Sequence, residues 1–206
     1  MEVASCYNGV MAHAITFEST RTLSQAAFRS FVEGRARKDD YHYELLNGRI
    51  VMNPPAGYPH GRIEHRVQLV LGRLATQRGL GEVFGSSQGY ELPSGDTVEP
   101  DGSFVSAERW SRMPPPEEGE FLRVVPDLVV EILSLSTGSH DRGEKKAIYE
   151  RNGVREYWLL DWRARELIVF HLSGDRYDPG TVFGEKERAR SAVLPGLDFP
   201  VGELLP

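Results

Sequence analysis

A carboxylate stands in the middle of a stretch whose other residues are typical of a buried β-strand. In VVPDLVVEILSLST, residues 124–137, apolar side chains occupy both faces from Leu128 to Leu133, and Glu131 interrupts them. Burying an unpaired carboxylate costs several kcal/mol, so core strands rarely contain one without a cation or a metal beside it. A functional role is therefore the favoured interpretation of Glu131.

A second acid, Asp101, lies in TVEPDGSFVS, residues 97–106, which has the pattern of another strand. Two-residue alternation puts Glu99, Asp101 and Ser103 on one face of that strand. If the two strands are neighbours, Asp101 and Glu131 converge. Adjacent carboxylates repel, so either one is protonated or the pair holds a hard cation, and a small set of oxygen ligands suits Mg²⁺ or Mn²⁺.

Structural roles compete with this interpretation. Carboxylates at strand ends also cap turns or pair with arginine, and for Asp101 both interpretations stay open. For Asp127, at the start of its strand, the structural role is favoured, and the candidate partners are Arg109, Arg123 and Arg142.

Other chemistries lack their residue patterns. The sequence contains no GxSxG, no GxxxxGK[ST], no GxGxxG after a strand and no HExxH. His60 and His65 are five residues apart, which does not stack them on one helical face, so a histidine zinc site is not expected. The single cysteine, Cys6, excludes an internal disulfide and a thiolate cluster, and its place near the N-terminus makes it a poor nucleophile.

The elements that must position the acids follow from periodicity and turn residues. Asn47-Gly48 between two apolar stretches predicts a β-hairpin. The tail from residue 165 to residue 199 alternates strand and turn patterns and is expected to wrap back onto the sheet, and Tyr157 and Trp158 are expected in the core. The other predicted elements are helices at 20–33, 60–78 and about 141–152 (Asp141 as its N-cap), and strands at 82–92, 97–105, 127–133 and 156–161. This order predicts an α/β protein of the α+β kind, with a mixed sheet flanked by helices.

Length and composition limit the organisation. The 206 residues fit one compact domain at 19–206, preceded by a flexible extension at 1–18. No run of about 18 apolar residues and no signal peptide is found, so we expect no membrane association and a cytoplasmic location. The net charge of −6 argues against broad binding of nucleic acid, so any such binding must be local or assisted by a metal or a partner.

Several segments together resemble a known family. YELLNGRIV, EPDGSFV, PDLVVEILSLST, DRGEKKAIYERNGVREYWLLD and LPGLDF cover most of residues 41–200 and are similar to the Uma2 (Uma-two) family of endonuclease-like proteins, within the PD-(D/E)XK nuclease superfamily. The resemblance implies a restriction-endonuclease-like αβββαβ core with an N-terminal hairpin, metal-dependent hydrolysis of phosphodiester bonds, and DNA as the substrate. It also implies a possible homodimer, since members that cut duplexes often pair.

The resemblance also assigns residues. Pro100-Asp101 matches the PD half of the motif and Glu131 the (D/E) position, while Glu44 matches an additional acid that some members bring near the metal. The superfamily lysine is missing, because Leu133 occupies its position. We also expect His60 and Glu64 near the site as accessory residues, since the first turn of helix 60–78 follows the hairpin.

A lysine on the next helix can replace the missing one. Lys145 shares a helical face with Ile148 and Tyr149, whose apolar character indicates that this face meets the sheet. Lys146 falls instead on the stripe expected to face solvent. The sequence therefore predicts that Lys145 supplies the charge beside Glu131; the alternative is that Lys145 is only a structural ion-pair partner.

Two functions follow. The leading one is a Mg²⁺- or Mn²⁺-dependent endodeoxyribonuclease in which Asp101 and Glu131 bind the metal and act with Lys145 in catalysis. The alternative is a catalytically degenerate binding or assembly module on the same scaffold, which the acidic net charge and Leu133 favour.

Overall fold

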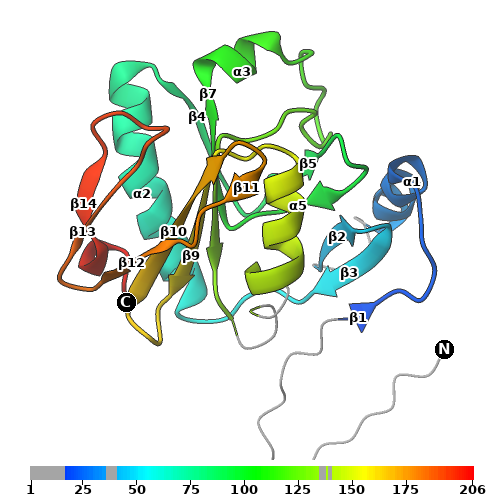
Figure 1. Ribbon diagram of the computed structural model, residues 1–206. Helices are drawn as coiled ribbons and strands as arrows, with labels where there is room; N and C mark the ends of the chain where they lie inside the picture. The colour runs from blue at the N-terminus through cyan, green and yellow to red at the C-terminus, as the bar shows by residue number, and fades with distance from the viewer. Residues whose placement is uncertain (1–16, 36–40, 135–137, 139–140) are drawn as a thin grey trace, which may run out of the picture.

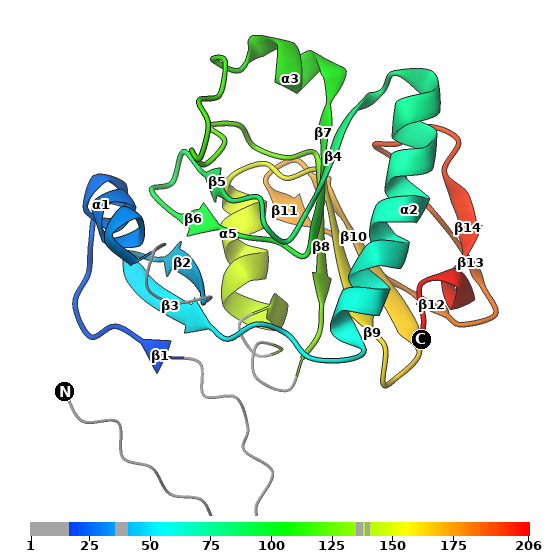
Figure 2. The ribbon, with the colours of Figure 1, turned by 180° about the vertical axis from the view of Figure 1, so that it is seen from behind.

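The computed structural model describes residues 17–35, 41–134, 138 and 141–206, and its elements are stacked in layers. Figure 1 shows a large central sheet with helix α2 (His60–Arg78) on one face and helix α5 (Lys146–Arg151) on the other. A smaller sheet lies beyond α5, and α1 (Gln25–Arg35) covers it; the view from behind in Figure 2 shows the same order.

The large sheet has seven strands in the order β11-β10-β9-β8-β7-β4, and β12 also pairs with β10. Strand β8 pairs antiparallel with β7 and parallel with β9. The sequence α2-β4-β7-β8-α5-β9 is the predicted αβββαβ core, which is confirmed. The bounds are β4 Gly81–Gly85, β7 Gly102–Ser106, β8 Leu128–Ile132, β9 Glu156–Asp161, β10 Glu166–Ser173, β11 Arg176–Tyr177 and β12 Thr181–Gly184.

The small sheet contains the predicted hairpin. Its order is β1-β3-β2-β6-β5, with β1 Phe17–Glu18, β2 His42–Leu46, β3 Arg49–Asn53, β5 Tyr90–Glu91 and β6 Thr97–Val98. Asn47 and Gly48 both have positive φ, 50° and 79°, which is the two-residue turn that Asn-Gly favours. Residues 17 and 18, assigned above to the N-terminal extension, pair with β3; residues 1–16, Cys6 included, lie outside the described part.

The two long strands predicted at 82–92 and 97–105 are each divided. Strands β4 and β7 pair with each other in the large sheet, whereas β5 and β6 pair with each other in the small sheet. The chain changes sheets at Glu99-Pro100-Asp101, where Pro100 has no N–H to donate to a ladder. The predicted common strand face of Glu99, Asp101 and Ser103 is therefore wrong, and Asp101 lies at the junction of the two sheets.

Two helix predictions change at their first residues. Helix α1 begins at Gln25 rather than residue 20, because the Ser24 hydroxyl accepts from the Ala27 N–H at 3.3 Å and caps the helix there. The helix predicted at 141–152 starts with the π-helical turn η1 (Asp141–Lys145), which α5 continues. Helix α2 has its predicted bounds and ends at Gly79, whose φ is 59°.

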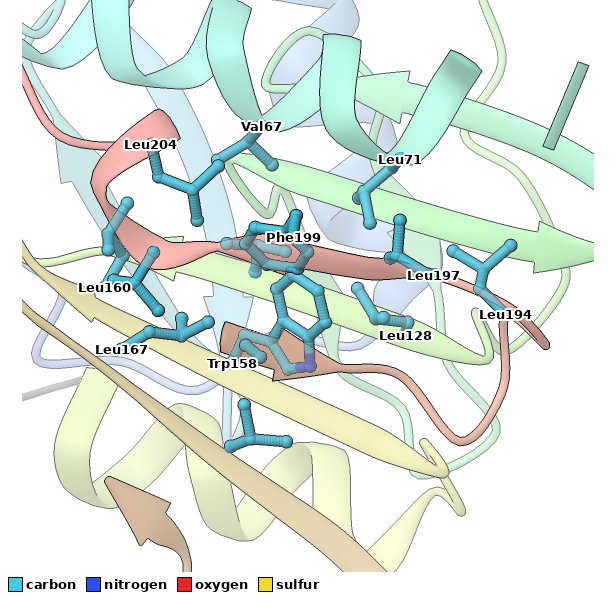
Figure 3. Close-up of a cluster of buried hydrophobic side chains, with 14 of the residues drawn as sticks. Val67, Leu71, Leu128, Trp158, Leu160, Leu167, Leu194, Leu197, Phe199 and Leu204 are labelled. Atoms are coloured by element: carbon cyan, nitrogen blue, oxygen red, sulfur yellow. The ribbon is translucent and has the colours of Figure 1, made fainter. Parts of the chain in front are cut away.

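The core lies on both faces of the large sheet. Between the sheet and α2, Trp158 packs on Phe199 with ring centroids 5.5 Å apart, among leucines of the C-terminal segment (Figure 3). This segment contains β13 (Arg188–Arg190), β14 (Asp198–Pro200) and the 3-10 turn η2 (Val201–Glu203), so the prediction that the tail wraps onto the sheet is confirmed. Tyr157 is fully buried on the α5 face. The remaining helix, α3, spans Ala107–Arg112.

No helix in the described ranges is long and apolar enough to cross a membrane.

The packing predicts the cost of a cavity. Leu160 in β9 is fully buried in the cluster on the α2 side of the large sheet, so Leu160→Ala is expected to lower the free energy of unfolding by about 2–5 kcal/mol. Urea unfolding followed by circular dichroism measures the change. Val182→Ala on β12, where the side chain is 54% exposed, is the control and is expected to stay within about 0.5 kcal/mol of the parent. Equal midpoints for the two variants would contradict this assignment of the core.

Candidate active site

A cavity of about 430 Å³ lies where the two sheets, the first turn of α2 and η1 meet. The loop between β3 and α2 forms one side of it, and the turn after β9 contributes Trp162 and Arg163. Six acids line it: Glu44, Glu64, Glu99, Asp101, Glu131 and Asp141. One lysine, Lys145, also lines the cavity, which is therefore a concave and strongly acidic site.

Asp101, directly before β7, approaches Glu131 in the neighbouring strand β8. Gly102 of β7 is paired with Val130 of β8, and the two strands are antiparallel. Asp101, the residue before Gly102, therefore lies beside Glu131, the residue after Val130. The Ile132 N–H donates to Asp101 Oδ2 at 2.6 Å, which fixes the aspartate against β8. The convergence predicted for Asp101 and Glu131 is thus present, although Asp101 reaches it from the sheet junction and not from within a strand.

Glu131 is buried, and its partners are a lysine and a tyrosine. Its Oε1 accepts from Lys145 Nζ at 2.7 Å and from the Tyr149 hydroxyl at 2.6 Å. Burial raises the pKa of Glu131 well above its ordinary value; Lys145 opposes this shift, and the neighbouring carboxylates add to it. These two contacts are what make the carboxylate tolerable inside the strand.

Lys145 is surrounded by carboxylates. Its ammonium lies 2.7 Å from Glu131, 2.9 Å from Glu44 and 3.9 Å from Asp141. Burial alone would lower the pKa of Lys145, but these acids raise it well above its ordinary value, so the lysine is charged. The predicted meeting of Lys145 with Glu131 is confirmed.

Lys146 departs from its predicted place. Its ammonium lies over the Phe170 ring, 3.8 Å from the centroid, and the residue is half-buried instead of facing solvent. Phe170 of β10 offers an aromatic face to the cation, which draws the side chain onto the sheet.

Glu44 belongs to the site although it lies close to the hairpin turn. It is buried in β2, accepts from the Glu99 N–H at 2.9 Å and from Asn53 Nδ2 at 3.2 Å, and contacts Lys145. Because β2 is in the small sheet and Lys145 lies at the junction of η1 and α5, this contact joins the hairpin to the rest of the site.

The two accessory residues lie at the cavity as expected. His60, the first residue of α2, approaches Asp101 Oδ2 with its Nε2 at 3.2 Å. Burial lowers the pKa of His60, but the contact with Asp101 outweighs it, and the pKa is raised overall. Glu64 accepts from Ser86 through both the N–H and the hydroxyl, at 3.1 and 2.9 Å.

Sequence reasoning missed three parts of the site. Asp141 was expected only as a helix cap, and Tyr149 only as a packing residue, yet one lines the cavity and the other donates to Glu131. His42, whose Nδ1 lies 2.8 Å from Glu99, was not considered. Two-residue alternation along β2 would have placed His42 on the same face as Glu44.

Asp127 has the structural role that was favoured for it. It accepts from the Ser106 N–H at 2.7 Å and pairs with Arg109 at 3.1 Å and Arg155 at 2.6 Å. Of the three arginines considered, Arg109 is thus a partner, whereas Arg123 pairs with Glu91 and Glu120, and Arg142 with Asp161.

The donor set fits a hard divalent cation with few protein ligands. No group of three or more His, Cys, Asp and Glu side chains with metal-binding geometry is found within the described residues. The acids nevertheless outnumber the single lysine, and Asp101 and Glu131 offer carboxylate oxygens from the sheet junction and from the adjacent strand β8. Mg²⁺ commonly binds through one or two carboxylates, with water and substrate completing its shell, so these residues fit Mg²⁺ or Mn²⁺.

The mixed sheet, its flanking helices and this acidic cavity define a protein of the restriction-endonuclease-like fold. The model of the Uma2 family, described as "Putative restriction endonuclease", matches residues 28–202, and the chain belongs to that family. A crystal structure of a "putative nuclease belonging to DUF820" from Anabaena variabilis has a TM-score of 0.70 to this fold, with 18% identity over 88% of this chain and 97% of that one. No curated protein matches the sequence.

The buried charges predict a penalty for losing Lys145. Lys145→Met leaves Glu131 and Glu44 without their cation, so the free energy of unfolding at pH 7 is expected to fall by about 3–5 kcal/mol. Because the pKa of the Glu131 carboxyl is raised in the folded state, this carboxyl takes up a proton at a higher pH in the folded protein than in the unfolded chain. Because Lys145 lowers the pKa of Glu131, its removal raises that pKa further, and Lys145→Met gains more stability from protonation than the parent does. The penalty is therefore expected to shrink as the pH falls from 7 toward the ordinary glutamate range. Urea unfolding in EDTA measures both effects.

Lys146→Met is the matched control. It removes only the contact with Phe170, so a loss of about 0.5–1 kcal/mol that does not depend on pH in this range is expected. Lys145→Met combined with Glu131→Gln should recover part of the loss, because the amide needs no cation. A Lys145→Met variant as stable as Lys146→Met at pH 7 would show that Glu131 is not ionised beside the lysine.

Proposed function

We propose that the protein is a metal-dependent endonuclease that hydrolyses phosphodiester bonds in DNA. One observation carries the proposal: Lys145 lies 2.7 Å from Glu131 in the cavity that Asp101 also lines. Lys145 thereby supplies the charge of the lysine that is missing at position 133. The two acids and the cation of the superfamily pattern line one cavity. Membership of the Uma2 family supports the same conclusion.

Each residue has a role in this proposal. Asp101 and Glu131 would hold Mg²⁺ or Mn²⁺, which, when bound, polarises a phosphate oxygen and lowers the pKa of a water molecule. Lys145 would keep Glu131 ionised and offset negative charge at the phosphate. His60 would orient Asp101, and Glu44 would position Lys145.

The proposal extends to partners and location. DNA in the cytoplasm is the proposed substrate. A homodimer is part of the proposal, because nucleases that cut both strands of a duplex often act in pairs. Glu64 is proposed as an accessory residue that holds the Ser86 loop beside the cavity.

A second candidate is a degenerate scaffold that binds or assembles without cutting. The contacts of Glu131 favour it, because Oε1 is already engaged by Lys145 and Tyr149. The net charge of −6 favours it too, since proteins that bind the DNA backbone are usually basic.

The nuclease proposal predicts cleavage that depends on the metal and on two acids. With Mg²⁺ or Mn²⁺, the purified protein is expected to nick or cut plasmid or single-stranded DNA, and Asp101→Ala or Glu131→Gln should reduce the rate by more than about 100-fold, as loss of a metal ligand requires. Asp175→Ala, in an exposed turn outside the cavity, is the control and should cleave like the parent. Cleavage that persists in Asp101→Ala would point to a contaminating nuclease.

Metal binding separates the two candidates. Isothermal titration with Mn²⁺ is expected to give a saturable signal that Glu131→Gln abolishes and that Asp175→Ala keeps. Absence of any titration by the parent protein, together with absence of cleavage, would favour the degenerate scaffold.

A further inference from the structure

An exposed tyrosine stands at the edge of the cavity. Tyr58 is 83% exposed, more than any other large hydrophobic side chain of the described residues, and it lines the cavity. A scattered exposed apolar residue is ordinary on a protein surface, but an aromatic ring beside a cluster of buried charges offers a stacking face next to the chemistry.

The segment that carries Tyr58 is stiff and anchored. It runs from Pro54 to Pro59 and joins β3 to the lower end of α2 in Figure 2, and three of its six residues are prolines. Pro59 is buried, and the next residue, His60, contacts Asp101. Prolines fix φ at three positions of the segment, which reduces the backbone freedom that is lost when the segment binds a ligand.

A cation and a second aromatic ring line the same cavity from the turn after β9. The Arg163 guanidinium lies over the Trp162 ring, 4.2 Å from its centroid. Asp161 Oδ1 accepts from the Arg163 N–H at 3.2 Å and the Ala164 N–H at 3.0 Å, which fixes the turn. Arg163 is exposed and has no ion pair with an acid within the described ranges, whereas Arg142 and Arg165 nearby are each paired.

We propose that Tyr58 and the Trp162–Arg163 pair form a clamp for an unpaired nucleobase and its phosphate, so that the substrate class is single-stranded DNA. This proposal rests on the proposed function, because it concerns the same cavity. The cavity of about 430 Å³ has the size of a small-molecule site, and a base reaches such a site only outside the helical stack.

The charge of the protein supports stacking over phosphate neutralisation. The net charge is −6 and six acids line the cavity, so a long basic track for a duplex is missing from its lining. Base–aromatic stacking needs no basic surface and tolerates any base. In this clamp the Arg163 guanidinium at the edge of the cavity contacts the phosphate of the stacked nucleotide.

Fluorescence anisotropy in EDTA tests the clamp without cleavage. The probes are a labelled 12-nucleotide single strand and a hairpin duplex containing the same sequence. The full chain is expected to bind the single strand more tightly than the duplex, and Tyr58→Ala should weaken single-strand binding by about 5- to 150-fold, the loss of one stacked base. Tyr58→Phe and Tyr58→Trp keep the ring face and should bind like the parent. Tyr41→Ala, an exposed tyrosine outside the cavity, is the matched control.

Salt dependence separates the two halves of the clamp. Arg163→Ala should reduce the slope of log affinity against log salt by about 0.7, the contribution of one phosphate contact on a single strand, while Tyr58→Ala should leave the slope unchanged. Both residues are exposed, so these variants are expected to fold, which urea unfolding verifies.

Three results would overturn the clamp: no single-strand binding, tighter binding of the duplex, or equal affinities of Tyr58→Ala and Tyr41→Ala. The binding assay contains no divalent metal, so its result does not depend on cleavage. A protein that binds the single strand through Tyr58 in EDTA but does not cleave DNA with Mg²⁺ or Mn²⁺ would contradict the nuclease proposal and leave the clamp standing.

Discussion

The buried ion pair between Lys145 and Glu131 is the interaction on which the site depends. A carboxylate in the middle of a buried strand is costly unless a cation reaches it, and the ammonium of Lys145 does so at 2.7 Å. The same ammonium contacts Glu44 at 2.9 Å. One charge therefore connects β8 of the large sheet, β2 of the small sheet and the helix between them, and the position of each element limits the others.

The arrangement concentrates more negative charge than one lysine can balance. Burial raises the pKa of Glu131 even with Lys145 beside it, because Asp141, Asp101 and Glu44 add to the repulsion. Structures keep such unfavourable clusters where function requires them, since hydrophobic residues would pack at lower cost. An excess of oxygen ligands in a cavity is also what a divalent cation needs, so the electrostatic cost and the proposed chemistry have the same origin.

Local patterns were sufficient for much of this fold. The Asn47-Gly48 turn, helix α2 with its Gly79 end and the order of the αβββαβ core follow from neighbouring residues alone. The division of 82–92 and 97–105 between two sheets could not be predicted, because strand pairing is decided by distant partners. Two-residue alternation therefore predicted correctly that Asp101 lies near Glu131. It did not predict that Asp101 lies at the junction of the two sheets and outside a strand.

The same limit applies to the site. Lys145 could be predicted because its apolar neighbours at i+3 and i+4 indicate which helical face meets the sheet. Tyr149 is one of those neighbours, and nothing in its spacing distinguishes a packing ring from one whose hydroxyl also donates to a carboxylate. The partial burial of Lys146 was missed because the ring that it covers, Phe170, lies on β10, and helical spacing does not show which side chains a neighbouring strand presents.

The supply of the charge from a helix also determines when the site becomes complete during folding. Leu133 packs in the core where a strand-borne lysine would have stood, so the sheet can form with its acids but without their cation. Only the docking of α5 brings Lys145 to Glu131. A chain in which this helix has not docked therefore carries an incomplete charge cluster, so a working site requires the whole domain to be folded.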